Sequence, residues 1–308
     1  MRSSRISGWG VALPEKVLTN ADLEGMFDTS DEWITERSGI RERRIGGTTS
    51  GLATDAARTA LLRAGAGADV ELLILATSTP DQQLPASSSV VQHALGLTCG
   101  AVDVNAACSG FVYAYVMAHQ MVMGGMDRVV VVGSEVMSRM IDWDDRGTAV
   151  LFGDGAGAVV LDATEADDPG MLGWDLGSDG SLRHILDADI GGFLKMDGKE
   201  VFRRAVRVMI DSCRASMDMA GVAPDEITLF VPHQANSRII DSAIGKIGIA
   251  PDRVASVLER TGNTSAASVG IALSEAADAG RLSPGDLVLL CGFGAGMTWA
   301  SAVVRWNP

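Results

Sequence analysis

The stretch Asp103–Met126, which reads DVNAACSGFVYAYVMAHQMVMGGM, decides how the rest of the chain is interpreted. A short apolar run, Ala101–Val104, is typical of a buried strand, and small residues connect it to Cys108. An apolar segment then runs from Ser109 to Met123 and stops at a glycine pair, which predicts a helix. Because this helix is apolar on nearly all sides, we expect it to be buried, with only its first turn open to a ligand.

Cys108 lies at the junction between this strand and this helix. Free backbone N–H groups and the positive end of the helix dipole stabilise an anion there, so the pattern predicts a favoured thiolate and a candidate nucleophile. The alternative is a buried structural cysteine, because cysteine is among the most frequently buried residues. Cys108 alone does not decide between the two.

Length and composition restrict the class of protein. The 308 residues are 47% hydrophobic and carry a net charge of −14 at pH 7, which argues against a nucleic-acid partner and against an anionic membrane. Ser109, His119 and Gln120 interrupt the apolar segment after Cys108, so no span of about 18 apolar residues is expected. The start of the chain lacks the apolar stretch of a signal peptide, which predicts a cytoplasmic protein with reduced cysteines. The cysteines and histidines are scattered, so we expect no metal site.

The second half of the chain repeats the order of the first at a nearly constant separation. We read this as an internal duplication, with an N-terminal half (residues 1–167) that carries the cysteine and a C-terminal half (residues 168–308). The acidic segment EADDPG is the expected linker. The matched pairs are Glu71–Ala76 with Ile227–Pro232, Asp103–Gly110 with Glu259–Ser268, and Asp127–Gly133 with Gly285–Gly292.

Strands that alternate with helices predict an α/β fold with mixed or parallel sheets covered on both faces. Two such halves packed together would bury the helix after Cys108 between their sheets. The strand-to-helix turns of both halves would then face a common cleft, where we expect the chemistry to lie.

Two turns of the second half carry the side chains that could complete a site with Cys108. VPHQAN contains His233 after a strand, and TGNTS contains Asn263. A cysteine, a histidine and a side-chain amide combine a nucleophile with groups that handle protons and bind an oxyanion. Taken alone, His233 could be a core residue and Asn263 a simple turn residue.

Several motifs resemble those of β-ketoacyl-ACP synthase III. They are DVNAACSGF, VPHQAN, GNTSAAS, TSDEWI, DRGTAVLFGDGAG and GFGAGMTW, and the likeness runs through essentially the whole chain. The resemblance implies a thiolase-like, layered αβαβα fold built from two duplicated halves and acting as a homodimer. It also implies the decarboxylative condensation of a short acyl-CoA primer with malonyl-ACP, which starts fatty acid synthesis and uses no further cofactor.

By the same resemblance, Cys108 accepts the acyl group, and His233 and Asn263 form the decarboxylation pair. The backbone N–H groups of Cys108 and Ala295 are the implied oxyanion donors. We also expect His233 to act as a neutral donor through Nε2–H, because the decarboxylation step requires no proton removal.

The resemblance also implies where substrates bind. Coenzyme A and the acyl carrier protein are expected at Trp33, Arg37, Arg146, Phe202, Ala235 and Arg238. The acyl pocket is expected at Leu84, Met137, Phe152 and Leu194, with Leu84 reaching the pocket of a partner subunit. Family members often have an aromatic residue at this position. A leucine there suggests that the acyl pocket has room for a group larger than acetyl. The sequence departs from the family at Lys199, where some members have an asparagine that contacts pantetheine.

Four other classes compete with this interpretation. The nearest is a related acyltransferase of secondary metabolism that moves an acyl group onto a carrier, alcohol or amine without decarboxylation. The presence of Asn263 favours condensation. A thiolase would need a second cysteine near the C-terminal glycine motif, and Cys291 lies on the preceding strand instead. A non-catalytic scaffold needs none of the three side chains, and a papain-like hydrolase would lack the duplication.

Overall fold

A computed structural model of the chain describes residues 2–65, 67, 69–165 and 169–308. The main sheet of the N-terminal half has the strand order β1-β7-β6-β4-β5. β4 runs parallel to β5 and β6, whereas β7 runs antiparallel to β1 and β6. These strands are β1 (Arg2–Ala12), β4 (Leu72–Ala76), β5 (Gly100–Val104), β6 (Arg128–Val136) and β7 (Asp154–Glu165).

The main sheet of the C-terminal half has the order β11-β12-β13-β8. β11 and β12 are parallel, and β13 runs antiparallel to β12 and β8. The strands are β8 (Met171–Ser178), β11 (Leu229–Pro232), β12 (Leu287–Gly294) and β13 (Thr298–Arg305). The central strands are covered on both faces, which explains their nearly continuous apolar sequences.

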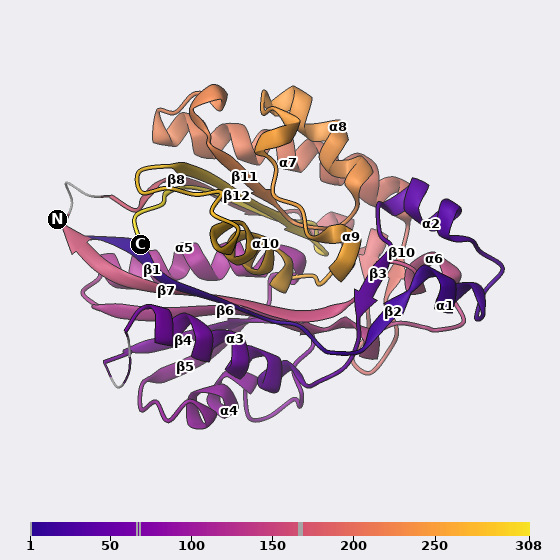
Figure 1. Cartoon of the computed structure of the whole chain (residues 1–308), viewed down its shortest axis with the longest axis horizontal. Coiled ribbons are helices and arrows are strands. Elements are labelled where there is room, and N and C mark those ends of the chain that lie inside the picture. The colour runs from indigo at the N-terminus through magenta and orange to yellow at the C-terminus, as the bar shows by residue number, and fades with distance from the viewer. Residues whose placement is uncertain (1, 66, 68, 166–168) are drawn as a thin grey trace.

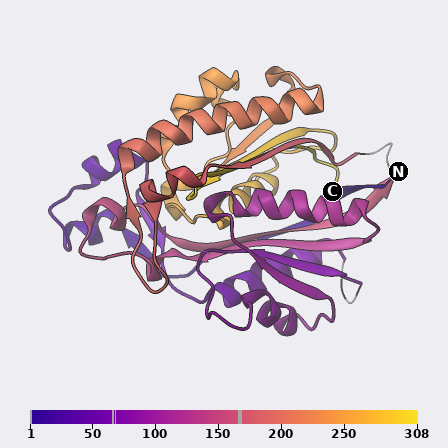
Figure 2. The ribbon, with the colours of Figure 1, turned by 180° about the vertical axis from the view of Figure 1, so that it is seen from behind.

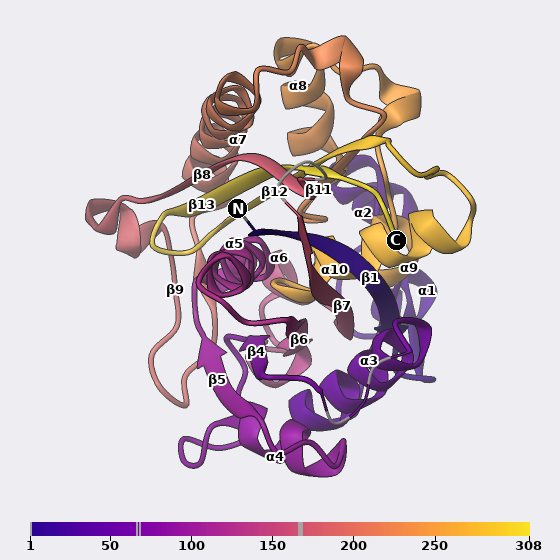
Figure 3. The ribbon, with the colours of Figure 1, turned by 90° about the vertical axis from the view of Figure 1, so that its left-hand side faces the viewer.

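Five layers result from the packing of helices on these sheets (Figure 1). Two helices, α5 (Gly110–Met123) and α10 (Ala267–Asp278), lie between the sheets and contact both, as the end-on view in Figure 3 shows. The outer layers are α3 (Thr49–Arg63) with α4 (Ser87–Ala94) on the first sheet, and α7 (Gly198–Ala220) with α8 (Ser237–Ile247) on the second. Seen from behind in Figure 2, α5 runs through the middle of the molecule. The predicted layered αβαβα arrangement is confirmed.

The remaining elements extend from one end of the layers, at the right in Figure 1, with α9 nearer the centre. They include the helix that carries Trp33 and Arg37. They are β2 (Val17–Thr19), α1 (Asn20–Glu24), α2 (Asp31–Ser38), β3 (Glu42–Arg44), α6 (Arg146–Ala149), β9 (Leu186–Asp187), β10 (Lys195–Met196) and α9 (Leu258–Thr261).

The topology agrees with an internal duplication. β1, β4, β6 and β7 occupy the same places in the first sheet as β8, β11, β12 and β13 in the second. The counterpart of β5 is reduced to one parallel bridge between Phe230 and Val254. The expected boundary between residues 167 and 168 lies outside the described residues, between the end of β7 at Glu165 and the start of β8 at Met171.

One predicted match between the halves was two residues out of register. The sequence comparison paired Asp103 with Glu259, whereas the backbone pairs Asn105 with Asn263. Among the residues that the structure describes, Ala107 and Ser265 are the non-glycine residues with positive φ, 48° in each. Each follows one of these asparagines by two residues. The register depends on this local geometry, which apolar composition does not encode.

The apolar cluster around α5 and α10 forms the centre of the molecule and includes Phe111, Tyr115 and Ile271, all fully buried. Within the described ranges, no helix combines the length and the apolar character needed to cross a membrane. The same ranges contain no group of three or more histidine, cysteine or acidic side chains arranged to hold a metal ion.

Candidate active site

Cys108 lies in a 3₁₀ turn, Ala107–Ser109, between β5 and α5. Asn105 Oδ1 accepts a hydrogen bond from the backbone N–H of Ala107 at 3.1 Å. This bond supports the left-handed backbone at Ala107, a conformation that costs energy for a residue with a Cβ. The sharp turn places the Cys108 side chain in a cavity between the two halves.

The predicted favoured thiolate is wrong for the ligand-free chain. Burial raises the pKa of the Cys108 thiol to about 12, and the nearby Glu135 carboxylate also raises it. A hydrogen bond with the Ser265 side chain lowers the pKa but does not offset burial. Desolvation exceeds the effect of the helix terminus because the thiol is taken almost fully out of water.

His233 follows the last residue of β11 and is 1% exposed. Its backbone N–H donates to the Cys291 carbonyl at 2.7 Å, and its Nδ1 lies 2.7 Å from Ser268 Oγ. Burial lowers the pKa of His233 to about 3, so the imidazole is neutral near pH 7. Ser268 Oγ accepts from the Gln234 N–H at 3.3 Å, which leaves the serine proton free to donate to Nδ1.

Asn263 connects the two halves of the molecule. Its backbone N–H donates to Leu151 O at 2.9 Å, and its carbonyl accepts from the Gly153 N–H at 3.0 Å. Its side-chain Oδ1 accepts from the Ser265 N–H at 2.9 Å. Because this bond occupies the amide oxygen, the Nδ2 group is the donor left for a ligand in the cavity that Asn263 lines.

The two expected oxyanion donors lie where β12 approaches the Cys108 turn. A Cβ on Gly294, the last residue of β12, would come within 2.5 Å of the Cys108 backbone nitrogen and 2.9 Å of the Ala107 Cβ. Glycine therefore keeps this nitrogen accessible. Ala295, the next residue, lines the same cavity as Cys108.

An inner cavity of about 330 Å³ brings the predicted catalytic residues together. Cys108, His233 and Asn263 all line it, with Ala295 at one side. Its apolar wall includes five further residues predicted to bind acyl or pantetheine groups: Met137, Phe152, Leu194, Phe202 and Ala235. Met137, Phe152 and Leu194, three of the four residues expected in the acyl pocket, therefore line the same cavity as Cys108.

An outer cavity of about 1290 Å³ adjoins the inner one and shares Leu151, Met196, Gly198, Phe202 and Asn236 with it. The guanidinium groups of Arg37 and Arg146 each lie 4.7 Å from the centre of the Trp33 ring. Arg238 lines the same cavity, so all the side chains predicted to bind the coenzyme A nucleotide meet here. This basic entrance contrasts with the net charge of −14 and suits an anionic ligand.

Leu84 does not line the cavity of its own chain. It is 83% exposed, in the loop that follows β4. Its expected role concerns a partner subunit and stays a prediction. Lys199, the departure from the family pattern, lines the outer cavity among the arginines.

Sequence reasoning missed several residues of the site. Glu135 is fully buried on β6 beside the catalytic turns, and Ser265 contacts it. Their signal was an acidic residue within the apolar run VVVVGSEV and a serine within GNTSAAS. His184 and Lys195 also line the outer cavity. Asn236 donates from Nδ2 to the Arg37 carbonyl at 2.8 Å and thereby attaches α8 to α2.

Comparison with known proteins agrees with this geometry. Two family models described as 3-oxoacyl-[acyl-carrier-protein] synthase III and its C-terminal region match residues 102–180 and 217–306. The chain is 48% identical to β-ketoacyl-[acyl-carrier-protein] synthase III of Brucella suis over 99% of its own length and 100% of that protein. A crystal structure of 3-oxoacyl-[acyl-carrier-protein] synthase III from Aquifex aeolicus superposes with a TM-score of 0.96 at 45% identity, covering 98% of this chain and 100% of that one. The corresponding synthase from Pseudomonas aeruginosa gives 0.95 at 40% identity and 99% coverage of both chains.

Proposed function

The chain belongs to the β-ketoacyl-[acyl-carrier-protein] synthase III family of thiolase-fold condensing acyltransferases, and from this premise we propose how its own residues carry out the condensation. The substrates are a short acyl-CoA primer and malonyl-ACP, and the product starts a fatty acid chain. The observation that carries the proposal is the convergence of Cys108, His233 and Asn263 on one cavity behind a basic entrance.

In the first step, Cys108 Sγ attacks the carbonyl carbon of the acyl-CoA. The bond between that carbon and the coenzyme A sulfur breaks, and the thiol proton ends on the departing sulfur. The carbonyl oxygen carries negative charge in the transition state, where the N–H groups of Cys108 and Ala295 stabilise it. Apolar walls around the resulting thioester keep water away from it.

In the second step, malonyl-ACP loses carbon dioxide. The electron pair of the broken carbon–carboxylate bond forms the new bond to the carbonyl carbon of the acyl group on Cys108. The Cys108–acyl bond breaks, and Sγ takes up a proton. Negative charge builds on the malonyl thioester oxygen, where His233 Nε2–H and Asn263 Nδ2 donate hydrogen bonds. The lowered pKa of His233 and the proton available from Ser268 support the neutral tautomer with Nε2–H.

The entrance residues accommodate the remainder of each substrate. Trp33 and Arg37 stack on the nucleotide, Arg146 and Arg238 pair with its phosphates, and Phe202 flanks the pantetheine arm. Ala235 leaves room for that arm beside His233. The same cations receive the acidic face of an acyl carrier protein during the second step.

We propose that two copies of the chain associate along β5 in the cytoplasm. β5 is an edge strand of its sheet, and Val102 on it is 41% exposed. An edge with unpaired backbone groups and exposed apolar side chains favours pairing with a second copy. The exposed Leu84 then reaches the acyl pocket of the partner, where its size sets the length of the accepted primer.

The experiment that tests the function is intact-mass analysis after incubation with a panel of acyl-CoAs, followed by malonyl-ACP. We expect a mass gain of one acyl group that is absent in Cys108→Ala, then loss of this group with formation of a β-ketoacyl carrier. Discharge to another acceptor without decarboxylation would support the alternative acyltransferase, which the full-length similarity to synthases does not favour. Leu84→Phe should shift the primer preference toward acetyl-CoA.

A further inference from the structure

Glu135 is a buried carboxylate that none of the steps above uses. It lies on β6 with no exposed surface. Its Oε1 accepts from the Ser265 hydroxyl at 3.0 Å and from the Ala266 backbone N–H at 3.4 Å. The N–H of Ser78 donates to both carboxylate oxygens at 3.1 Å. Glu135 thus attaches the first half of the molecule to the turn that begins α10.

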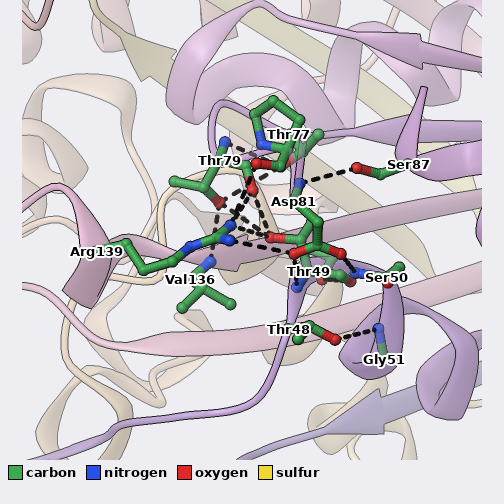
Figure 4. Close-up of polar contacts among 12 residues, drawn as sticks. Thr48, Thr49, Ser50, Gly51, Thr77, Thr79, Asp81, Ser87, Val136 and Arg139 are labelled. Carbon is green, nitrogen blue, oxygen red and sulfur yellow. Dashed lines mark hydrogen bonds and ion pairs between the residues drawn. The ribbon is translucent and has the colours of Figure 1, made fainter. Parts of the chain in front are cut away.

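The other carboxylate oxygen is held by two threonine hydroxyls. Thr79 Oγ1 donates to Oε2 at 2.5 Å and Thr77 Oγ1 donates at 3.2 Å. Each hydroxyl already accepts a backbone N–H, from Val136 at 2.9 Å and from Thr79 at 3.1 Å respectively (Figure 4). All five groups around Glu135 are therefore donors, an environment that fits an ionised carboxylate.

No salt bridge involving Glu135 occurs within the part of the chain that the structure describes. Arg139, which reaches the same loop in Figure 4, donates to the Thr79 carbonyl at 2.5 Å, to Thr49 Oγ1 at 3.0 Å and to Asp81 at 3.3 Å. Burial raises the pKa of Glu135, and its hydrogen bonds oppose that effect. A buried carboxylate without a cationic partner lowers the stability of the fold, so a function is needed to explain why Glu135 is there.

The turn held by Glu135 carries Asn263. Ser265 has a φ of 48°, which is strained for a residue with a Cβ and persists only where neighbours hold it. Its N–H fixes the Asn263 amide through Oδ1, and its side chain also contacts Cys108. Movement of Ser265 would turn the Asn263 Nδ2 group away from the cavity.

The second half has no counterpart of this carboxylate. Gly292 packs against Ser109 as Gly133 packs against Ala267, so Gly294 occupies in β12 the place of Glu135 in β6. Glycine leaves the Cys108 N–H accessible, whereas Glu135 occupies the equivalent N–H of Ala266. One turn is open to a substrate oxyanion, and the other already holds an anion of the protein.

We propose that Glu135 is a positioning residue, whose carboxylate holds the turn from Asn263 to Ala266 so that the Asn263 amide points at the malonyl thioester. This inference rests on the proposed roles of Cys108 and Asn263. It places the effect of Glu135 in the decarboxylative step, because acyl transfer to Cys108 uses the N–H groups of Cys108 and Ala295, which Glu135 does not contact. General loss of stability would slow both steps together.

The test measures the two steps separately in Glu135→Gln, which keeps the volume of the side chain and removes its charge. Mass spectrometry gives the rate at which acyl-CoA acylates Cys108, and a malonyl-ACP chase of the acylated enzyme gives the second rate. We expect the second rate to fall about tenfold while the first stays within about threefold of wild type. Charge-assisted hydrogen bonds are about twice as strong as neutral ones, so the substituted turn is held less firmly.

Two further variants make the result specific. Gly245→Ala on α8 is the control, because its added Cβ would meet no atom within 4 Å, so both rates should match wild type. Asn263→Ala should slow the second step at least as much as Glu135→Gln. An equal loss in both steps of Glu135→Gln, or an unchanged second step, would overturn the positioning role. An unchanged second step in Asn263→Ala would instead remove the proposed role of Asn263, and the inference with it.

Discussion

The turn at Cys108 and the turn at Asn263 have the same backbone conformation but present different groups to the cavity. In each, an asparagine side chain accepts the N–H two residues later, and that residue has a φ of 48°. In the first turn the asparagine is Asn105, which is exposed, and Cys108, the proposed nucleophile, comes three residues after it. In the second, Asn263 itself is buried and faces the cavity. A duplicated frame thus carries the proposed nucleophile in one half and the proposed hydrogen-bond donor in the other.

The difference follows from what β6 and β12 place against each turn. Gly294 leaves the N–H of Cys108 accessible, whereas Glu135 binds the N–H of Ala266. Four measurements would sharpen this comparison or contradict it.

The largest effect is expected for Gly294→Ala. The added Cβ would lie 2.5 Å from the Cys108 nitrogen, so the turn must shift or lose its oxyanion donor. Loss of one such donor reduces the rate by roughly 100- to 1000-fold. We expect a loss of this size in the rate at which acyl-CoA acylates Cys108, measured by mass spectrometry of samples quenched at successive times. Gly245→Ala on α8 is the matched control, because its Cβ would meet no atom within 4 Å. Acylation of Gly294→Ala at the wild-type rate would contradict the assigned oxyanion site.

The equivalent asparagines provide the second test. Asn263→Ala should slow the reaction of the acylated enzyme with malonyl-ACP by about 100-fold and leave acylation intact, because it removes a donor used only in the second step. Asn105→Ala changes the same backbone support in the other turn, and we expect at most a severalfold loss, confined to acylation. Similar rate profiles for the two variants would show that the turns do not divide the chemistry.

The third test follows the protonation of Cys108. With its pKa raised to about 12 by burial, the thiol should be alkylated by iodoacetamide at a rate that rises about tenfold per pH unit from pH 7 to pH 9. The labelled peptide is quantified by mass spectrometry, with Cys108→Ala as the blank. A plateau below pH 8 would indicate that the helix terminus stabilises the thiolate after all.

The smallest effect concerns stability in acid. Burial lowers the pKa of His233 to about 3 and that of His119 to about 4, both below the ordinary value of 6.5. The unfolded chain binds their protons first, so stability is lost as the pH falls from about 6.5 toward these values. We expect roughly 1–2 kcal/mol per histidine between pH 7 and pH 5 in urea unfolding. His119→Gln should show a smaller decline over this range, and an identical decline would contradict a neutral buried His119.

Much of this site was predictable because each residue type stands in a recognisable local pattern. Cys108 follows a strand and precedes an apolar helix, His233 ends a strand, and Asn263 lies in a glycine turn, so all three were identified. Trp33, Arg37, Arg146 and Arg238 were predicted only through family motifs. Apart from Trp33 and Arg37, these residues are far apart in the sequence, and no local pattern indicates that they meet at the outer cavity.

The sequence by itself determined the alternation of strands and helices, the repeated halves and the residue types of the site. These depend on local propensity and apolar periodicity, which are written in neighbouring residues. Only the tertiary structure decided the register of the two turns, the high pKa of Cys108 and the contact of Glu135 with Ser265. Each of these depends on burial or on contacts between distant segments, and desolvation and cross-half hydrogen bonds exist only once the halves have packed together.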